Sequence, residues 1–276
     1  MAGSTLHYET EGDGPPVVFI HGLGATSNVW HAQRAALSKY FRVIVYDRSG
    51  CGRSPQAADG YSIDGWADEL AGLLDHLEIS TTVVVGHSLG SMIAQRFAAK
   101  YATRTRALVL AGGEAVLTPD GKGVLTERAA MIESQGLTAA VDPWLAGVLS
   151  AATRAANPAL AGLLRAMFLA YDDATYAHQC LALRDGDVRG DHAHIACPTI
   201  LLVGDQDPVT PLARIYPDEP LVIRTINVSP TIDTLHFQGA RHRAAGLELE
   251  KALEVSLRQV GGEIGVAHEV AQRLPH

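Results

Sequence analysis

The segment Gly86-His87-Ser88-Leu89-Gly90 places a nucleophilic hydroxyl between two glycines at a fixed spacing. A serine hydroxyl attacks a carbonyl carbon when a base removes its proton. The apolar residues 83–85 come before the segment and a helical pattern follows it, which predicts a strand, a sharp turn and a helix. We therefore predict that Ser88 is a nucleophile. An incidental serine in a glycine-rich turn is the weaker alternative.

The same turn also offers a backbone amide that can stabilise negative charge. Leu89 is the first residue of the predicted helix, which extends over residues 89–101. Amide groups in the first helical turn have no partner within the helix and lie at the positive end of its dipole. We expect the Leu89 N–H to stabilise the oxyanion that forms when Ser88 attacks a carbonyl.

The elements around this turn alternate between strands and helices. Short apolar runs predict buried strands, and apolar residues every three or four positions predict amphipathic helices. The predicted core elements are strands at 5–10, 17–20, 41–46, 81–85, 107–111 and 199–203 and helices at 29–37, 63–77 and 89–101. This rhythm predicts an α/β fold in which helices cover both faces of a mostly parallel sheet. The ligand site of such a sheet lies at the carboxyl ends of its strands.

Residues 114–196 interrupt the rhythm, because they are rich in alanine and leucine and contain no convincing strand. We interpret them as a helical lid (cap) inserted into a core domain formed by residues 1–113 and 197–276. Ordinary outer helices of the core are the alternative interpretation.

The loops that follow the predicted strands resemble those of the α/β-hydrolases, from residue 5 to about residue 260. His21-Gly22-Leu23-Gly24 follows one strand, and residues 47–54 follow the next. The resemblance implies an α/β-hydrolase fold in which the Leu23 amide is the second oxyanion donor and His21 is structural rather than a base. It implies that the 47–54 loop is a supporting turn in which Cys51 is packed rather than nucleophilic.

In this family the catalytic residues follow one another along the chain as serine, acid and histidine. Residues 204–211 follow the last predicted strand and are similar to the family's acid loop. The resemblance matches the acid, which orients the base, to Asp207. The alternatives are Asp205 in the same loop and Glu114, which follows the 107–111 strand.

The base comes from the segment 237–242, which is similar to the strand end that carries the family's histidine. The resemblance matches the base to His242. His236, inside the predicted strand, and His268, beyond the helix that follows, are the alternatives. With Ser88 and Asp207, this histidine would complete a catalytic triad for acyl transfer to water, which needs no metal or organic cofactor.

Residues 21–27 and 176–198 are similar in particular to 3-oxoadipate enol-lactonases. This resemblance implies a small lactone substrate that carries a carboxylate. Arg184 or Arg128 would then pair with that carboxylate, unless both are surface residues. The serine nucleophile argues against haloalkane dehalogenases and epoxide hydrolases, which use an aspartate. A carboxylesterase, a carbon–carbon bond hydrolase of ring-cleavage products and a small-molecule binding protein of the same fold remain open alternatives.

The composition limits which binding partners and which cellular compartment are expected for this protein. The net charge of −8 and the lack of a dense basic cluster argue against nucleic-acid binding. Three cysteines, Cys51, Cys180 and Cys197, make no disulfide framework and favour a reducing compartment. With no signal-peptide pattern and no apolar stretch of membrane-spanning length, we expect a cytoplasmic protein that does not bind membranes and acts on a small ester or lactone.

Residues 191–194, Asp-His-Ala-His, are the one segment that suggests a metal site. No second cluster of ligands with suitable spacing accompanies them. We interpret them as a solvated connection to the 199–203 strand and expect no metal.

Overall fold

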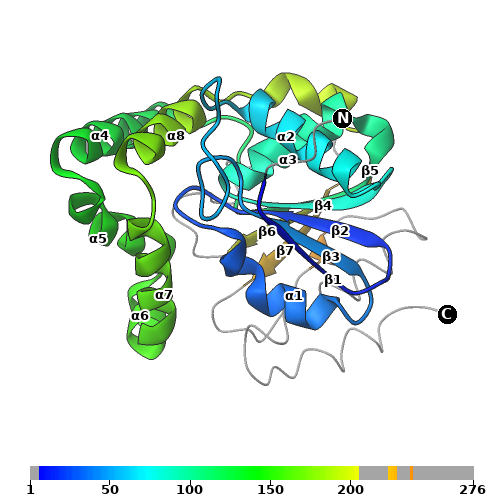
Figure 1. The fold of residues 1–276 in the computed structure, drawn as a ribbon, viewed down its shortest axis with the longest axis horizontal. Coiled ribbons are helices and arrows are strands. Elements are labelled where there is room, and N and C mark those ends of the chain that lie inside the picture. Colours follow the sequence, from blue (N-terminus) through cyan, green and yellow to red (C-terminus); the bar gives the residue numbers. More distant parts are fainter. Residues whose placement is uncertain (1–5, 205–222, 229–236, 239–276) are drawn as a thin grey trace.

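The computed structural model describes residues 6–204, 223–228 and 237–238. In these ranges the chain forms one eight-stranded sheet with the strand order β1-β3-β2-β4-β5-β6-β7-β8 (Figure 1). The strands are β1 (Tyr8–Glu11), β2 (Pro16–Ile20), β3 (Arg42–Tyr46), β4 (Thr82–His87), β5 (Thr105–Ala111), β6 (Thr199–Gly204), β7 (Ile223–Val228) and β8 (Phe237–Gln238). Only β1 and β8, at the two edges, pair antiparallel with their neighbours. The prediction of a mostly parallel sheet is confirmed.

Helices pack on both faces of this sheet. Helix α1 (His31–Leu37) covers one face, and α2 (Ile63–His76) and α3 (Leu89–Lys100) cover the other (Figure 1). Short 3-10 helices η1 (Ser27–Trp30), η2 (Ala102–Arg104) and η3 (Arg189–His194) join these elements. The predicted helix at 29–37 is therefore divided between η1 and α1.

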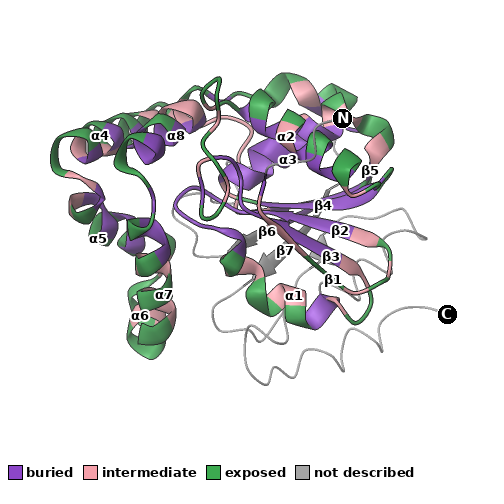
Figure 2. Ribbon diagram, viewed as in Figure 1, coloured by how far each residue is buried: buried purple, intermediate pink, exposed green. Residues whose placement is uncertain are grey.

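Alternation along the strands explains why both faces are covered. Successive side chains of a strand point to opposite faces. In β2, Val18 and Ile20 belong to the core that lies under α2 and α3, whereas Val17 and Phe19 belong to the core under α1. Both sets are buried, so the central strands contain apolar residues at nearly every position (Figure 2).

Five helices connect β5 to β6 and extend beyond the sheet (Figure 1). They are α4 (Pro119–Gln135), α5 (Leu137–Val148), α6 (Ala151–Ala156), α7 (Pro158–Leu169) and α8 (Asp173–Asp185). The two ends of this insertion meet, because Val116 forms an isolated β-bridge with Asp187 and the Val188 N–H donates to the Ala115 carbonyl at 2.8 Å. Among the described helices, none is both long and apolar enough to cross a bilayer.

The parallel arrangement determines where the loops gather. The pairs β2–β3 and β2–β4 run parallel, so their carboxyl ends lie at one edge of the sheet. The loop after β2 (residues 21–26), the loop after β3 (residues 47–54) and the turn at Ser88 therefore all start from that edge. Since ligands of such sheets bind outside the carboxyl ends of the strands, this edge is the candidate site.

Candidate active site

Ser88 occupies a strained turn between β4 and α3. Its φ of 52° and ψ of −121° lie outside the regions that non-glycine residues usually adopt, and Glu78 is the only other described non-glycine residue with a positive φ. Such a conformation costs on the order of 1–3 kcal/mol and persists only where the surroundings fix it. Here the Ser88 N–H donates to the Ala111 carbonyl at 2.9 Å, and the Ser88 carbonyl accepts from the Ser91 N–H at 2.8 Å. Strain held in this way is characteristic of functional positions.

The two glycines of the motif lie against backbone on both sides of the turn. A Cβ atom on Gly86 would be 2.3 Å from the carbonyl oxygen of Gly90. A Cβ atom on Gly90 would be 2.3 Å from the carbonyl oxygen of Ile20, at the end of β2. Both distances are far below van der Waals contact, and the obstacles are main-chain atoms. The close packing that brings the nucleophile beside the loop after β2 therefore requires glycine at both positions.

Replacing Gly86 by alanine is expected to lower the free energy of unfolding by about 2–3 kcal/mol, because the turn must shift to admit the methyl group. Urea unfolding followed by circular dichroism measures this difference. The matched control is Gly72→Ala in α2, where an added Cβ meets nothing within 4 Å. That change should raise stability by about 0.5–1 kcal/mol, because alanine has the higher helix propensity. Equal effects of the two substitutions would contradict the steric argument.

Leu89 and Leu23 are the two predicted oxyanion donors, and both lie beside the turn. Leu89 is the first residue of α3, so its amide is at the positive end of the helix dipole. Leu23 follows Gly22, and a Cβ atom on Gly22 would be only 3.2 Å from the Ser88 Cβ. The structure thus brings the loop after β2 into contact with the serine, although the two segments are more than sixty positions apart in the chain.

His21 is fully buried and holds no position from which it could act as a general base. Burial, together with the positive charge of Arg48, lowers its pKa to about 3. The Arg48 backbone N–H can only donate, and it lies 3.2 Å from His21 Nε2, so Nε2 is the acceptor. The ring proton is then on Nδ1, which donates to the Gly22 carbonyl at 2.9 Å. His21 is a neutral, structural histidine, in line with the expectation from the sequence.

Protein stability is expected to depend on pH through His21. The unfolded chain protonates this ring near its ordinary pKa of 6.5, whereas the folded chain resists protonation down to about 3. The unfolded state therefore binds more protons in this window, and the stabilisation is complete above pH 6.5 and is lost as the pH falls towards 3. Between pH 7.5 and 5.5 the loss should be about 1.4 kcal/mol.

Urea unfolding of the wild type and of His21→Asn at those two pH values isolates this contribution. The wild type should lose about 1.4 kcal/mol more than the variant, because asparagine does not titrate. An equal loss in both proteins would mean that other groups determine the acid sensitivity.

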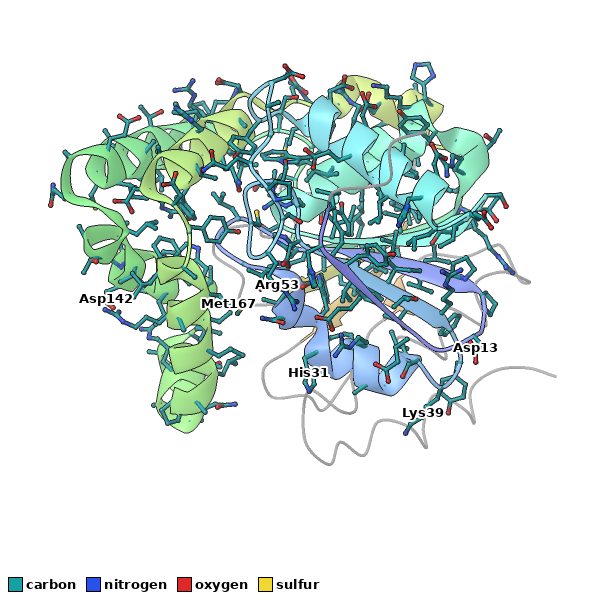
Figure 3. The ribbon with its side chains drawn as sticks, in the orientation of Figure 1. Asp13, His31, Lys39, Arg53, Asp142 and Met167 are labelled. Carbon is teal, nitrogen blue, oxygen red and sulfur yellow. The ribbon has the colours of Figure 1, made fainter. Side chains whose placement is uncertain are left out.

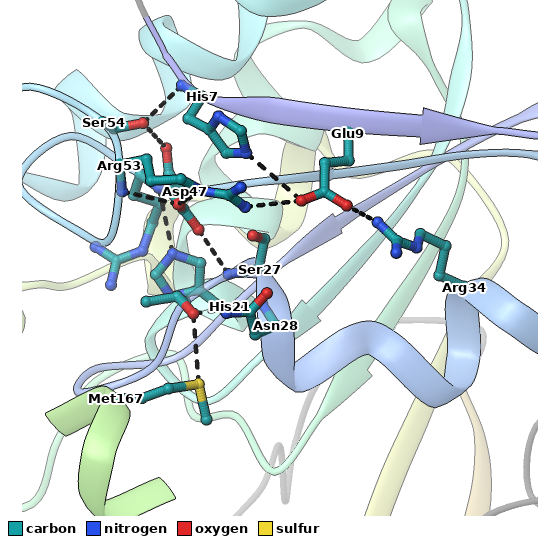
Figure 4. Close-up of polar contacts among 12 residues, drawn as sticks. His7, Glu9, His21, Ser27, Asn28, Arg34, Asp47, Arg53, Ser54 and Met167 are labelled. Atoms are coloured by element: carbon teal, nitrogen blue, oxygen red, sulfur yellow. Dashed lines mark hydrogen bonds and ion pairs between the residues drawn. The ribbon is translucent and has the colours of Figure 1, made fainter. Parts of the chain in front are cut away.

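The 47–54 loop is held rigidly next to these groups (Figure 4). The buried Asp47 carboxylate accepts from the backbone N–H groups of Ser27 at 2.8 Å and Arg53 at 3.0 Å. Burial acts to raise the pKa of Asp47, but these hydrogen bonds outweigh it and the net pKa is lowered. Ser54 Oγ donates to the Asp47 carbonyl at 2.6 Å and accepts from the His7 N–H at 2.8 Å. The loop is a supporting structure, joined through Ser27 to the end of the 21–26 loop.

Cys51, in the same loop, is buried and does not provide a second nucleophile. Burial raises the pKa of its thiol, with Arg48 and two hydrogen-bonding neighbours opposing the shift only in part. A thiol is nucleophilic as its thiolate, and this one stays protonated at neutral pH. Its Sγ lies 3.6 Å from Gln179 Oε1 of α8, so Cys51 contributes to packing between the loop and the inserted helices.

The inserted helices contact the loop that carries Leu23. Trp144 of α5 lies behind Gly24, where an added Cβ would be 2.9 Å from the indole ring. Thr26 Oγ1 donates to Met167 Sδ of α7 at 3.4 Å (Figure 4), and the Tyr171 hydroxyl donates to a carbonyl of this loop. Figure 3 shows Met167 on the side of the inserted helices that faces the sheet and Asp142 on the outer side. The insertion thus packs directly against the candidate site.

An aromatic cluster forms the inner side of this insertion. The ring centroids of Trp144 and Phe168 are 4.6 Å apart, those of Phe168 and Tyr176 4.8 Å, and those of Tyr171 and Tyr176 5.4 Å. All four side chains are buried. Packed aromatic rings of this kind hold the helices in a defined arrangement over the loop.

The predicted acid and base lie outside the described residues. This applies to Asp207 and His242, and also to Asp205, His236 and His268. The alternative acid Glu114 is described: it follows β5, is half-buried, and its backbone carbonyl accepts from Gln95 Nε2 at 3.4 Å. The structure therefore places Ser88 and Leu89 beside the loop that carries Leu23, and the roles of these residues and of the acid and base stay predictions.

One interpretation from the sequence changes when the structure is considered. The 191–194 segment is not simply a solvated connection, because His192 is buried and its Nε2 lies 2.8 Å from Gln95 Oε1 of α3. His192 belongs to the short helix η3 and is its buried residue. The preceding residue, Asp191, pairs with Arg96 at 2.6 Å. Within the described part of the chain, no group of three or more His, Cys, Asp or Glu side chains could hold a metal ion.

Arg184, one of the two arginines considered as partners of a substrate carboxylate, pairs with its neighbour Asp185 on the surface. The nitrogen–oxygen distances are 2.8 and 2.7 Å.

Comparisons with known proteins agree with this architecture. 3-Oxoadipate enol-lactonase 2 of Acinetobacter baylyi is 31% identical over 218 residues, which cover 75% of this chain and 78% of the relative. The putative carbamate hydrolase RutD of Pantoea ananatis is 38% identical over 130 residues, a match that spans 47% of each chain. The crystal structure of the enol-lactonase from Burkholderia xenovorans LB400 superposes with a TM-score of 0.75 and 26% identity, over 91% of this chain and 96% of that one.

The match to a protein family covers the part of the chain that holds the strained serine, both glycine contacts and the two loops beside them. Residues 15–160 match the family described as the alpha/beta hydrolase fold. The parallel sheet, the turn between β4 and α3 and the insertion after β5 agree with that match. This protein is a member of the α/β-hydrolase family.

Proposed function

We propose that this chain is a serine hydrolase that cleaves small lactones or carboxylic esters through an acyl-enzyme on Ser88. The observation that carries the proposal is the strained Ser88, positioned at the start of α3 and in contact with Gly22. An activated serine next to two backbone amides can both attack a carbonyl and stabilise the resulting oxyanion. The similarity to enol-lactonases supports the lactone class of substrate.

The reaction proceeds in two halves. His242, oriented by Asp207, removes the proton from Ser88 as Oγ attacks the substrate carbonyl, and the Leu23 and Leu89 amides stabilise the tetrahedral oxyanion. Collapse of this intermediate breaks the acyl–oxygen bond, and His242 returns the proton to the leaving oxygen. In a lactone that oxygen stays attached to the acyl chain. Water, activated by the same histidine, then releases the acid and restores Ser88.

We propose that helices α4–α8, the cap, cover this site and shape its substrate range. These helices pack against the 21–26 loop through Trp144 of the aromatic cluster and through Met167. Substrate selection would then depend on the cap, whereas the bond-cleaving groups belong to the sheet. This division is common where one fold supports many activities.

A fluorophosphonate probe tests the proposal, because it reacts with activated serine nucleophiles. The wild-type protein should be labelled at one site, Ser88, as located by mass spectrometry of the digested protein. Ser88→Ala should abolish labelling, whereas Ser80→Ala, at an exposed serine before β4, should leave it unchanged. A folded wild-type protein that resists the probe would favour a small-molecule binding protein of this fold.

A substrate panel then separates the hydrolase classes. Carboxylated lactones, uncharged esters, a carbamate and a ring-cleavage dienone should be compared by kcat/KM, which measures discrimination between substrates. The proposal expects the carboxylated lactones to have the highest values. A carbamate or a dienone at the top of the ranking would replace the lactone as the substrate class while leaving Ser88 as the nucleophile.

A further inference from the structure

Arg48 is an unusual side chain because it is charged and completely buried. It lies in the 47–54 loop and has a relative exposure of 0%. Its guanidinium stacks over Trp66 of α2, with Cζ 4.7 Å from the ring centroid. Within the described part of the chain, Nε and Nη1 have no hydrogen-bond partner. The third nitrogen, Nη2, donates to the carbonyl oxygen of Gly22 at 3.2 Å.

Burial of a charge with so few partners is costly. Taking a guanidinium out of water costs more free energy than a cation–π contact recovers. A side chain needed only to fill the space beside Trp66 would be apolar. The charge of Arg48 also acts on the Glu69 carboxylate, whose pKa it lowers, but the hydrogen bond to Gly22 is a directed contact that an apolar side chain could not make.

Arg48 holds the Gly22 carbonyl in two ways. The first is the direct hydrogen bond from Nη2. The second passes through His21, because the Arg48 backbone N–H occupies Nε2 and leaves the ring proton on Nδ1, which donates to the same carbonyl. The Gly22 oxygen is therefore held by the Arg48 side chain and by a histidine whose other ring nitrogen binds the 47–54 loop.

The planarity of the peptide transmits this constraint to the oxyanion donor. The Gly22 carbonyl and the Leu23 N–H belong to one peptide unit, and the described chain contains no cis peptide bond. In a planar trans peptide the C=O and N–H groups point in opposite directions. Fixing the Gly22 oxygen towards Arg48 therefore directs the Leu23 N–H away from Arg48, while the Gly22 Cα stays against Ser88.

We propose that Arg48 is a positioning residue, which orients the Gly22–Leu23 peptide so that the Leu23 amide points at the oxyanion. The inference rests on the proposed function, because it presupposes acyl transfer at Ser88. The oxyanion exists only in the transition state and the tetrahedral intermediate. Arg48 therefore acts on kcat and leaves the binding of the ground-state substrate nearly unchanged.

Arg48→Met tests the proposal, because methionine keeps an apolar stem against Trp66 and removes the donor. With p-nitrophenyl acetate, kcat should fall about 10- to 100-fold at nearly constant KM, a smaller loss than complete removal of an oxyanion donor. A trifluoromethyl ketone, which forms a hemiketal oxyanion on Ser88, should bind more weakly by the same factor. The control inhibitor is the methyl ether of the alcohol obtained by reducing this ketone, which has no carbonyl and forms no oxyanion. It should inhibit the variant and the wild type equally.

Arg53→Met is the matched control, since Arg53 belongs to the same loop but its side chain is 54% exposed and pairs with Glu9. Its kcat and its ketone affinity should equal those of the wild type. Arg48→Lys keeps one charged donor and should recover a large part of the loss in both measurements. A purely structural role for Arg48 predicts no such parallel recovery, because packing would affect both inhibitors alike.

The inference is overturned if folded Arg48→Met keeps the wild-type kcat, or if its kcat falls without a matching loss of ketone affinity. If Arg48→Met is unfolded by circular dichroism, Arg48→Lys and Arg48→Gln undergo the same two measurements and the same criteria apply. Failure of the proposed function is separate and is detected first, as a wild-type protein whose turnover does not depend on Ser88.

Discussion

Ser88→Ala is expected to lower kcat for p-nitrophenyl acetate by a factor on the order of 10⁴ to 10⁶, with the fold intact. The alanine keeps the backbone hydrogen bonds to Ala111 and Ser91 that fix the turn, and it removes only the attacking oxygen. Residual turnover would come from the oxyanion donors acting on water. Steady-state kinetics measures the loss, and the thermal unfolding curve reports on the fold.

The control for this experiment is Ser80→Ala, which removes an exposed hydroxyl shortly before β4. Its kcat should match that of the wild type. If Ser88→Ala retained wild-type turnover, another group would have to be the nucleophile. Cys51 would be a poor replacement, because its thiol is buried and stays protonated at neutral pH.

His242→Ala is expected to have the second-largest effect, a loss in kcat of at least about 10⁴-fold, because Ser88 would have no group to accept its proton. His236→Ala should change kcat by less than about threefold. Added imidazole should restore part of the activity of His242→Ala, since a free base can then accept the proton of Ser88. Kinetics with and without imidazole provide the measurement.

This experiment also decides between the histidines. An active His242→Ala, together with an inactive His236→Ala that imidazole rescues, would assign the base to His236 instead. His21 is not a candidate for the base, because its Nδ1 donates to the Gly22 carbonyl and its Nε2 accepts from the Arg48 backbone N–H.

The elements near Ser88 could be predicted from the sequence because their signals are local. The apolar run before Gly86 and the helical pattern after Leu89 are each visible within a dozen residues, and the structure has β4 and α3 there. The two faces of the sheet follow from the same apolar runs. In contrast, β7 (Ile223–Val228) has no counterpart among the predicted strands, because Arg224, Thr225 and Asn227 interrupt its apolar pattern.

The roles of individual polar residues depend on distant partners and could not be predicted in this way. Arg48 lies within a loop recognised as supporting, yet its burial against Trp66 and its bond to Gly22 join three separate segments. Its position directly after a buried strand, at the edge where the other loops gather, is the one sequence signal that pointed to it. The burial of His192 depends similarly on Gln95, which is 97 positions away along the chain.

The meeting of Val116 with Asp187 has a consequence for how this protein can change over evolution. Since both ends of the inserted helices are joined at one point, the spacing between β5 and β6 does not depend on the length or sequence of what lies between them. A different set of helices could join the sheet at the same point, provided that it kept the contacts that Met167 and Tyr171 make with the 21–26 loop. New specificities can therefore arise by changes in the helices between these contacts, while the turn at Ser88 stays fixed by its own hydrogen bonds.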